Sequence, residues 1–422
     1  MTPVRVRPLL ASAALACVFL VAAGCTPTTA QESPSSAPPS GPTTPPPPPP
    51  PQDIELTLVA AGDVLPHVSV TESATGPSGI DYSPLLAGID PWVDGADLAL
   101  CHLEVPIAPP GTEPTGYPMF RAPAELVRDL GEQGWDGCST ASNHSVDAGY
   151  DGLAATLGAL DEAKMGHVGT ARDEQESLGA QYYELHRSDR TITIAHLSAT
   201  YGLNGLTAPR GDWSVDLIDA QRIVQQAKAA RAAGADLVVV SLHDGVEYVT
   251  EPTEHQQETA HALAQSGQVD LVIGHHAHVP QKLVRLSGGP GNDGMWTAYG
   301  LGNLLSNQGP ECCVLASAVG LLLVADIKQP PGAPARVTGV RWAATTVDLA
   351  AAHRLRSTRE ALAHPDQGTL TVAELEERLQ IAKDAAGDAA EEQLEPPRPT
   401  GEPPRVIPRG SEPPASESPT PG

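Results

Sequence analysis

Residues 269–280, Val-Asp-Leu-Val-Ile-Gly-His-His-Ala-His-Val-Pro, join a short apolar run to a cluster of three imidazoles. The run Val269–Ile273 is rich in β-branched residues, which is typical of a buried strand. His275, His276 and His278 follow it directly. A single histidine after a strand is usually a hydrogen-bonded structural residue, whereas three together favour metal binding. The stretch therefore predicts a buried strand that ends at a metal site.

Ligand-type side chains also follow apolar runs elsewhere in the chain. They are Asp63 with His67, Glu104, Asn143 with His144 and Asp147, and His243. Each has an ordinary interpretation when taken alone: Asp63 as a turn or cap residue, Glu104 as a solvated charge, Asn143 as a turn former. In open α/β sheets, however, loops at the carboxyl ends of the strands converge on one crevice. We therefore expect five segments to form one site.

Apolar runs alternate with amphipathic helical patterns over about residues 53–350. The expected strands are Ile54–Ala61, Leu98–Leu103, Thr191–Leu197, Asp236–Leu242 and Val269–Ile273, and the expected helices are 124–133, 150–164, 216–233 and 253–266. Such alternation favours an α/β fold in which helices cover the sheets. Later runs at 295–300, 319–327 and 337–347 lack long intervening helices and look antiparallel, so a mixed sandwich of two sheets fits best.

The two ends of the chain differ in composition from this domain. Residues 26–52 are rich in Ser, Thr and Pro and end in polyproline, which predicts a semi-rigid linker. Residues 396–422 are rich in Pro, Ser and Glu and are expected to be disordered. A helical pattern at 371–394, which begins like a capping box, either packs on the domain or forms a charged surface helix. The folded domain is therefore expected over residues 53–395.

Residues 1–25 are organised like a bacterial export signal. Two arginines precede the apolar run Leu9–Val21, which is too short for a comfortable membrane span. Small residues then lead to Cys25, as in the lipobox of bacterial lipoproteins, where this cysteine is acylated. An ordinary cleaved signal with an incidental cysteine fits the same run. We expect an extracytoplasmic protein that Cys25 anchors to the cell membrane.

Charge and cysteine content limit the remaining possibilities. The formal net charge of −26 excludes the basic surface that nucleic-acid binding requires. No CxxC pair occurs, so a zinc ribbon or thioredoxin-like site is not indicated. Outside the cytoplasm Cys101 and Cys138 either form a disulfide or remain small buried side chains. The adjacent pair Cys312 and Cys313 has no interpretation from sequence.

Mixed carboxylate, amide and imidazole ligands without thiolates suit manganese, iron or zinc better than calcium. Two such divalent ions close together activate water and neutralise charge in a phosphoryl displacement. Glu104 is the candidate for a bridging carboxylate, and His144 or His275 for a general acid. The expected cofactor is therefore a pair of divalent transition metal ions.

Six ordered blocks of this sequence resemble the poly-γ-glutamate capsule synthesis proteins of the CapA type, within the calcineurin-like metallophosphoesterase superfamily. The blocks are Ala61–Asp63, His102–Ile107, Ser142–Gly149, Leu242–Tyr248, Gly274–Val279 and Tyr299–Asn303. The resemblance implies a four-layer α/β/β/α sandwich with a dinuclear metal centre. It also implies metal ligands at Asp63, Glu104, Asn143, His144, His243, His276 and His278, while the family does not consistently have a histidine at the position of His67.

The sequence departs from the family pattern beside these ligands. His102 replaces the usual asparagine, Asp244 a tryptophan, Ala277 a proline, and Leu304 a common aromatic residue. These changes alter the surroundings of the site, so substrate choice transfers least well. Three functions remain open: a metal-dependent hydrolase acting on a phosphoester or an amide, a protein that binds an anionic polymer or lipid phosphate beside capsule-synthesis proteins, or a binding module with a decayed site. The intact ligand types argue against the third.

Overall fold

The computed structural model describes residues 52–409. The predicted export signal, Cys25 and the predicted linker up to residue 51 lie outside the described residues. None of the helices in the described part has the length and apolar character needed to cross a bilayer. The description below concerns this part of the chain alone.

The first sheet has nine strands in the order β16-β15-β14-β1-β4-β5-β6, with β13 beside β1 and β17 beside β15. They are β1 (Ile54–Leu65), β4 (Leu98–Leu103), β5 (Gly137–Ser139), β6 (Gly166–Val168), β13 (Asn303–Ser306), β14 (Val319–Gln329), β15 (Arg336–Asp348), β16 (Arg354–Ser357) and β17 (Glu391–Glu392). β1, β4, β5 and β6 run parallel, whereas β14, β15 and β16 are antiparallel. The sheet is therefore mixed, as predicted.

The second sheet has seven strands in the order β11-β12-β10-β9-β8-β7-β18. They are β7 (Gln181–Arg187), β8 (Arg190–Thr200), β9 (Leu237–Asp244), β10 (Leu271–His276), β11 (Leu283–Leu286), β12 (Met295–Ala298) and β18 (Arg405–Ile407). Its four central strands, β8, β9, β10 and β12, are parallel. A small hairpin, β2 (Thr75–Gly76) with β3 (Gly79–Ile80), stands apart from both sheets.

Alternating side chains place each sheet between two apolar layers. In β1, Leu58 faces the core between the two sheets, and Val59 faces the core beneath the helices. In β9, Val239 faces the core between the sheets, while Val238 and Val240 face the other way. The two sheets therefore pack face to face, and each needs helices to cover its outer side.

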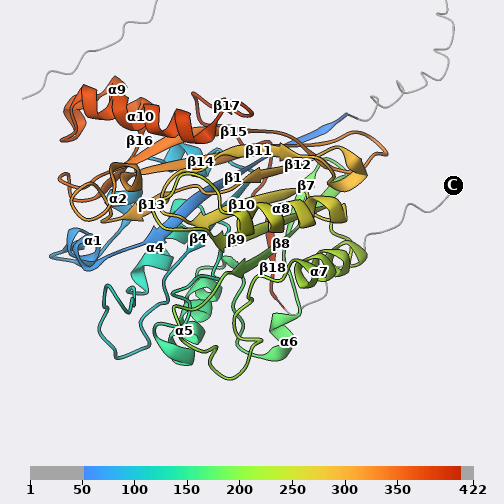
Figure 1. The fold of residues 1–422 in the computed structure, drawn as a ribbon, viewed down its shortest axis with the longest axis horizontal. Coiled ribbons are helices and arrows are strands. Elements are labelled where there is room, and N and C mark those ends of the chain that lie inside the picture. The colour runs from blue at the N-terminus through green and yellow to red at the C-terminus, as the bar shows by residue number, and fades with distance from the viewer. Residues whose placement is uncertain (1–51, 410–422) are drawn as a thin grey trace, which may run out of the picture. The chain divides into compact units, whose positions relative to one another are not determined.

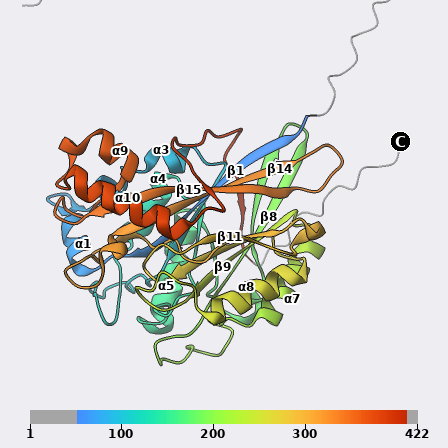
Figure 2. The same cartoon turned by 45° about the horizontal axis from the view of Figure 1, so that its top comes forward.

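Helices flank the two sheets (Figures 1 and 2). They are α1 (Val68–Ser73), α2 (Ser83–Leu86), α3 (Asp90–Asp94), α4 (Glu125–Gln133), α5 (Gly149–Glu162), α6 (Glu174–Ser177), α7 (Ala220–Ala232), α8 (Glu254–Ser266), α9 (Thr358–Ala363) and α10 (Val372–Ala386), with 3₁₀ turns at Pro290–Asn292, Leu315–Ala318 and Pro365–Gln367. α4 and α5 pack on the first sheet, and α7 and α8 on the second. The predicted four-layer α/β/β/α sandwich is confirmed.

The C-terminal part of the chain corrects two predictions. The helix predicted over 371–394 ends at Ala386, because Gly387 adopts a positive φ of 73°, and it packs on the domain through the buried Leu379 and Ala382. The prediction that disorder begins at residue 396 is wrong for residues 396–409. Strand β18 pairs with β7, and Thr400 donates to the buried Asp97 carboxylate. Pairing with a distant strand orders a segment whose own composition is unfavourable.

Candidate metal centre

The carboxyl ends of four strands bring distant ligand-type residues together. Asp63 on β1 lies opposite His102 on β4, and His243 on β9 lies opposite His275 on β10. The backbone N–H of His276 donates to Asp63 Oδ2 over 3.1 Å, which joins the second sheet to the first. The site therefore lies where the ends of the two sheets meet.

Asp63 is fully buried and faces several histidines. Its Oδ2 lies 3.1 Å from His278 Nδ1, and its Oδ1 lies 3.4 Å from His275 Nδ1. Burial alone would raise the pKa of this carboxyl, but these contacts hold the pKa well below its ordinary value. Asp63 is therefore an anion aimed into the cluster. Gly62 before it allows close approach, because a Cβ there would clash with Gly302 O.

Glu104 is fully buried, and neither of its carboxylate oxygens has a hydrogen-bond partner. The nearest histidine nitrogens are His278 Nε2 at 3.6 Å and His243 Nε2 at 3.8 Å from Oε1. Burial raises the pKa of Glu104 well above its ordinary value. An unpaired buried carboxylate is costly in free energy, and a bound cation removes that cost. The donor atoms therefore fit a metal ion.

Two groups of three side chains have donor atoms within 4.8 Å of one another: Asp63 with His102 and His243, and Glu104 with His276 and His278. Burial lowers the pKa of His102 and of His243 well below the usual value, and lowers that of His276 to about 3. These imidazoles are therefore neutral, the form that binds metals.

The ligand-type rings are held in place by a second set of contacts. His102 Nδ1 lies 2.8 Å from Ser139 Oγ, and His278 Nδ1 lies 3.0 Å from Asn303 Oδ1. His276 and His278 have positive φ angles of 87° and 55°, which turn the backbone after β10 sharply. Partners of this kind fix which ring nitrogen faces a metal.

Asn143 and His144 enter the cluster from the turn after β5. Asn143 Oδ1 lies 2.7 Å from His243 Nε2, so the amide oxygen faces the first group of ligands. His144 Nδ1 lies 2.7 Å from Asp147 Oδ2, a carboxylate that also accepts from the backbone N–H of Phe120. Asp147 therefore orients the His144 ring and leaves Nε2 for another partner.

The bacterial capsule synthesis protein PGA_cap family matches residues 57–308, more than half of the chain, and this range contains every residue of the cluster. The chain belongs to this family. The resemblance inferred from the six blocks is thereby confirmed.

Curated relatives of this PGA_cap protein include the capsule biosynthesis protein CapA of Bacillus anthracis, 26% identical over 60% of this chain and 61% of that protein. The PGA biosynthesis protein CapA of Bacillus subtilis is 28% identical over 44% and 46%. A probable polyglutamine synthesis accessory protein of Mycobacterium tuberculosis is 29% identical over 50% and 56%. The chain thus spans about half to three fifths of the length of these relatives.

Solved structures with a similar fold include the NAD nucleotidase NadN of Haemophilus influenzae, at 13% identity and a TM-score of 0.44, covering 80% of this chain and 58% of that one. The calcineurin-like phosphoesterase YfkN of Bacillus subtilis has 12% identity and a TM-score of 0.41, covering 78% and 97%. Likenesses this weak say nothing of activity, so the chemistry must come from this chain's own residues.

The structure brings seven of the predicted ligands into the cluster and leaves one beside it. Asp63, Glu104, Asn143, His144, His243, His276 and His278 gather there, and their role as ligands stays a prediction. His67 belongs to neither group of three, as is also true of His144, and its Nδ1 lies 3.1 Å from the carbonyl of Leu65. His275 is also buried, stacked on His102 at 4.0 Å.

Sequence reasoning noticed His102 only as a departure from the family pattern, yet the structure places it among the ligand-type groups. The signal available was its position, two residues before Glu104 and therefore on the same face of an extended strand. Asn303 was quoted within a motif but given no role. Its partner, His278, lies 25 residues earlier, so only the folded chain shows the contact.

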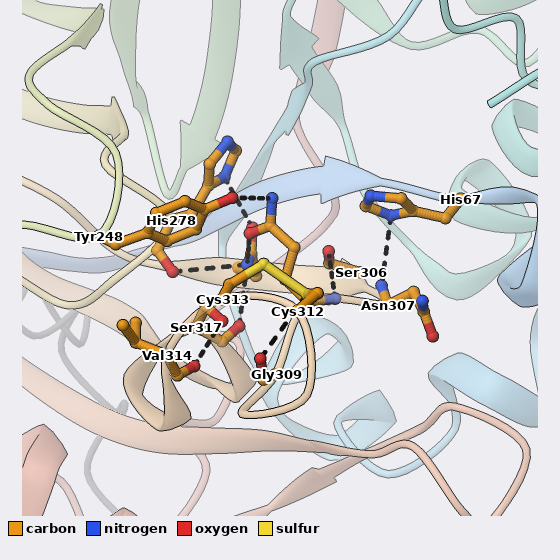
Figure 3. Close-up of a disulfide and its surroundings, with 12 residues drawn as sticks. His67, Tyr248, His278, Ser306, Asn307, Gly309, Cys312, Cys313, Val314 and Ser317 are labelled. Carbon is orange, nitrogen blue, oxygen red and sulfur yellow. Dashed lines mark hydrogen bonds between the residues drawn. A yellow bond between two sulfur atoms is a disulfide. The ribbon is translucent and has the colours of Figure 1, made fainter. Parts of the chain in front are cut away.

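A loop with a disulfide between adjacent cysteines, Cys312 and Cys313, packs beside this contact (Figure 3). Asn303 Nδ2 donates to Gln308 Oε1 over 2.9 Å, and Gln308 Nε2 donates to Tyr248 Oη over 3.1 Å. Hydrogen bonds thus connect this loop through Asn303 to the ring of His278. The Cys101–Cys138 pair is likewise bridged, which decides between the two alternatives left by the sequence.

Proposed function

We propose that this protein is an extracytoplasmic, metal-dependent hydrolase of phosphoester type that acts in the biosynthesis of a capsule or similar anionic polymer. The observation that carries the proposal is Glu104, whose buried carboxylate has no hydrogen-bond partner and faces imidazoles contributed by the second sheet. A buried carboxylate without a hydrogen-bond partner does not stabilise the packed interior, whereas it can bind a metal ion. Membership of the capsule synthesis family supports the biological setting.

Each group of three would hold one divalent transition metal; Asn143 Oδ1 lies 2.7 Å and Glu104 Oε1 lies 3.8 Å from His243 Nε2, so both could contribute an oxygen. The ligand types favour manganese, iron or zinc. Bound metals of this kind supply a nucleophilic water at neutral pH and neutralise charge on a phosphoryl group. The protein excludes solvent from the site, because Asp63, Glu104 and His243 are fully buried.

His144 is the better supported general acid of the two predicted. Its Nδ1 is held by Asp147, and its side chain retains a little exposure, so Nε2 can deliver a proton to a leaving group. His275 faces Asp63 with Nδ1 and is only 2% exposed, so it lies behind the carboxylate. We therefore assign His275 to positioning of His102, on which it stacks.

Metal analysis and an activity assay on the same preparation test the proposal. Purified protein is expected to contain transition metal and to hydrolyse a chromogenic phosphodiester or monoester with added manganese, and chelation should abolish the rate. His243→Ala and His278→Ala should lose both metal and rate, whereas His261→Ala, outside the centre on the exposed side of α8, should keep both. Wild-type protein that binds no transition metal would overturn the proposal.

A second candidate is a non-catalytic polymer-binding or assembly protein. The mycobacterial relatives are described as accessory proteins of polymer synthesis, which favours this role. It predicts tight metal binding without turnover, and binding of an anionic polymer that depends on the metal because the chain carries a net charge of −26. Metal-loaded protein that hydrolyses no phosphoester but binds poly-γ-glutamate would establish this alternative.

We further propose that Cys25 carries a lipid anchor and that residues 26–52 form the spacer between the membrane and the domain. The small residues before Cys25 and the polyproline after it support this arrangement. Mass spectrometry of the mature N-terminus provides the test. A diacylated or triacylated Cys25 is expected, and an unmodified chain that begins after Cys25 would exclude the anchor.

A further inference from the structure

Aromatic side chains are scarce in this protein, yet they gather around the candidate metal centre. The chain has 5 Trp, 8 Tyr and 2 Phe among 422 residues. Three of these rings lie against its imidazoles: Tyr201 is 4.5 Å from His276, Phe120 is 4.9 Å from His144, and Tyr248 is 6.1 Å from His278, measured between ring centroids. Because the chain contains so few aromatic residues, the presence of three beside one site indicates that they contribute to its function.

Tyr201 differs from the other two rings because it remains open to solvent. Its side chain is 42% exposed, whereas Phe120 is buried and Tyr248 is half-buried. A large exposed ring that packs only in part against the protein leaves apolar surface for a ligand. This surface lies directly beside His276, a member of the second group of ligands.

The backbone fixes Tyr201 in this place. The residue follows β8 directly, and its N–H donates to the carbonyl of His243 over 3.0 Å. Its hydroxyl lies 3.5 Å from Asn204 Oδ1, which in turn accepts from Asn143 Nδ2 over 3.2 Å. The ring is therefore held between the two groups of ligands, and its hydroxyl forms a separate contact with the Asn143 side of the centre.

The charged groups near Tyr201 are unfavourable for a polyanion. The carboxylates of Glu247 and Asp244 lie close enough to Tyr201 to act on it electrostatically. Glu247 is exposed to solvent. A chain with many negative charges would meet the Glu247 carboxylate wherever it extends beyond the metal ions, whereas an uncharged ring beside a single anionic group would not be repelled.

We propose that Tyr201 selects esters in which an uncharged ring, aryl or sugar, is attached next to the anionic group that the metals bind. The anionic group lies on the metal centre, and the ring lies on the open surface of Tyr201. This inference rests on the metal site of the proposed function but not on turnover. Tyr201 is then a specificity-determining residue. The substrate class is a small ester that carries a ring, instead of a long polyanion.

Binding of non-hydrolysable phosphonates to the manganese-loaded protein tests this inference by calorimetry. Phenylphosphonate is expected to bind about fivefold more tightly than methylphosphonate, as one aromatic contact provides. Tyr201→Leu should bring the ratio of the two affinities close to one. Tyr201→Phe should preserve the ratio, because it keeps the ring and removes only the hydroxyl that contacts Asn204.

The metal content of each variant separates the two proposals. Wild-type protein without metal means that the proposed function has failed, whereas metal-loaded protein with equal affinity for both phosphonates overturns the role of Tyr201 alone. Loss of the preference in Tyr201→Phe would show that the hydroxyl acts through Asn143 and would also overturn it. Tighter binding of n-hexylphosphonate than of phenylphosphonate would show that the surface of Tyr201 prefers an alkyl chain, as in a lipid phosphate. This result would overturn the preference for a ring.

Discussion

Among the single residues of the candidate metal centre, we expect Glu104 to respond most to a bound metal. Its carboxylate is excluded from water and unpaired, so the metal-free fold bears the cost of burying it. Burial favours the protonated form, as its raised pKa indicates. The residue is thus unfavourable for folding alone and favourable for metal binding.

Replacing Glu104 by glutamine is therefore expected to affect metal binding and folding in opposite directions. Metal affinity should fall more than about 100-fold, since a charged ligand is lost, while the metal-free protein should unfold at the same or higher denaturant concentration. Metal titration and urea unfolding measure the two effects. Glu247→Gln, a nearby exposed carboxylate, is the control and should change affinity less than about threefold. Wild-type affinity in Glu104→Gln would contradict the assignment.

We expect His278 to make metal binding depend on pH. Burial would lower its pKa, but the Glu104 carboxylate and the contact with Asp63 raise it to about 9. A metal must displace this proton, so apparent affinity should rise with pH between about pH 6 and 9 and level off above. Calorimetric titrations at several pH values provide the measurement. An affinity that is constant across this range would show that His278 is not a ligand.

At the level of elements, the parallel strands β4 and β5 are linked covalently. Cys101 and Cys138 lie opposite each other, and their disulfide closes a loop with a sequence separation of 37. β5 has only three residues, too few to show an alternating pattern, which explains why the sequence did not reveal it. The bridge helps hold the turn that carries Asn143.

The Cys101→Ala, Cys138→Ala double variant should lose about 2–4 kcal/mol of unfolding free energy, because the unfolded chain gains entropy. Urea unfolding under oxidising conditions measures the loss. The matched control is Cys312→Ala with Cys313→Ala, where adjacent residues close almost no loop and the change should be much smaller. Equal losses in the two double variants would contradict this explanation.

At the level of the whole described unit, residues 396–409 complete the second sheet. Strand β18 pairs with β7, and Ile407 is buried. Arg187 bonds the buried Asp97 and the Thr400 hydroxyl, so it ties the segment to the rest of the unit. The candidate metal centre lies at the carboxyl ends of β9 and β10, and β8 and β7 separate these strands from β18, so we expect the segment to support folding more than chemistry.

Truncation after Glu395 should therefore destabilise the domain by roughly 2–4 kcal/mol, from lost apolar burial and unpaired polar groups. Thermal and urea unfolding measure the effect. Arg405→Ala serves as a control, because its ion pair with Glu184 is more than half exposed on the arginine side and should contribute less than about 1 kcal/mol. A truncated protein as stable as the full chain would exclude a structural role for the segment.

The sequence by itself determined the α/β class, the main strands and helices, and the ligand-type residues, because alternation and strand-end chemistry are local signals. The tertiary structure alone decided which side chains meet. It placed His102 among the ligand-type groups, left His67 outside the two groups of three, paired Asn303 with His278 and ordered β18. These results depend on contacts between residues far apart in the chain, and apart from the spacing of His102 and Glu104 no local pattern of side chains predicts them.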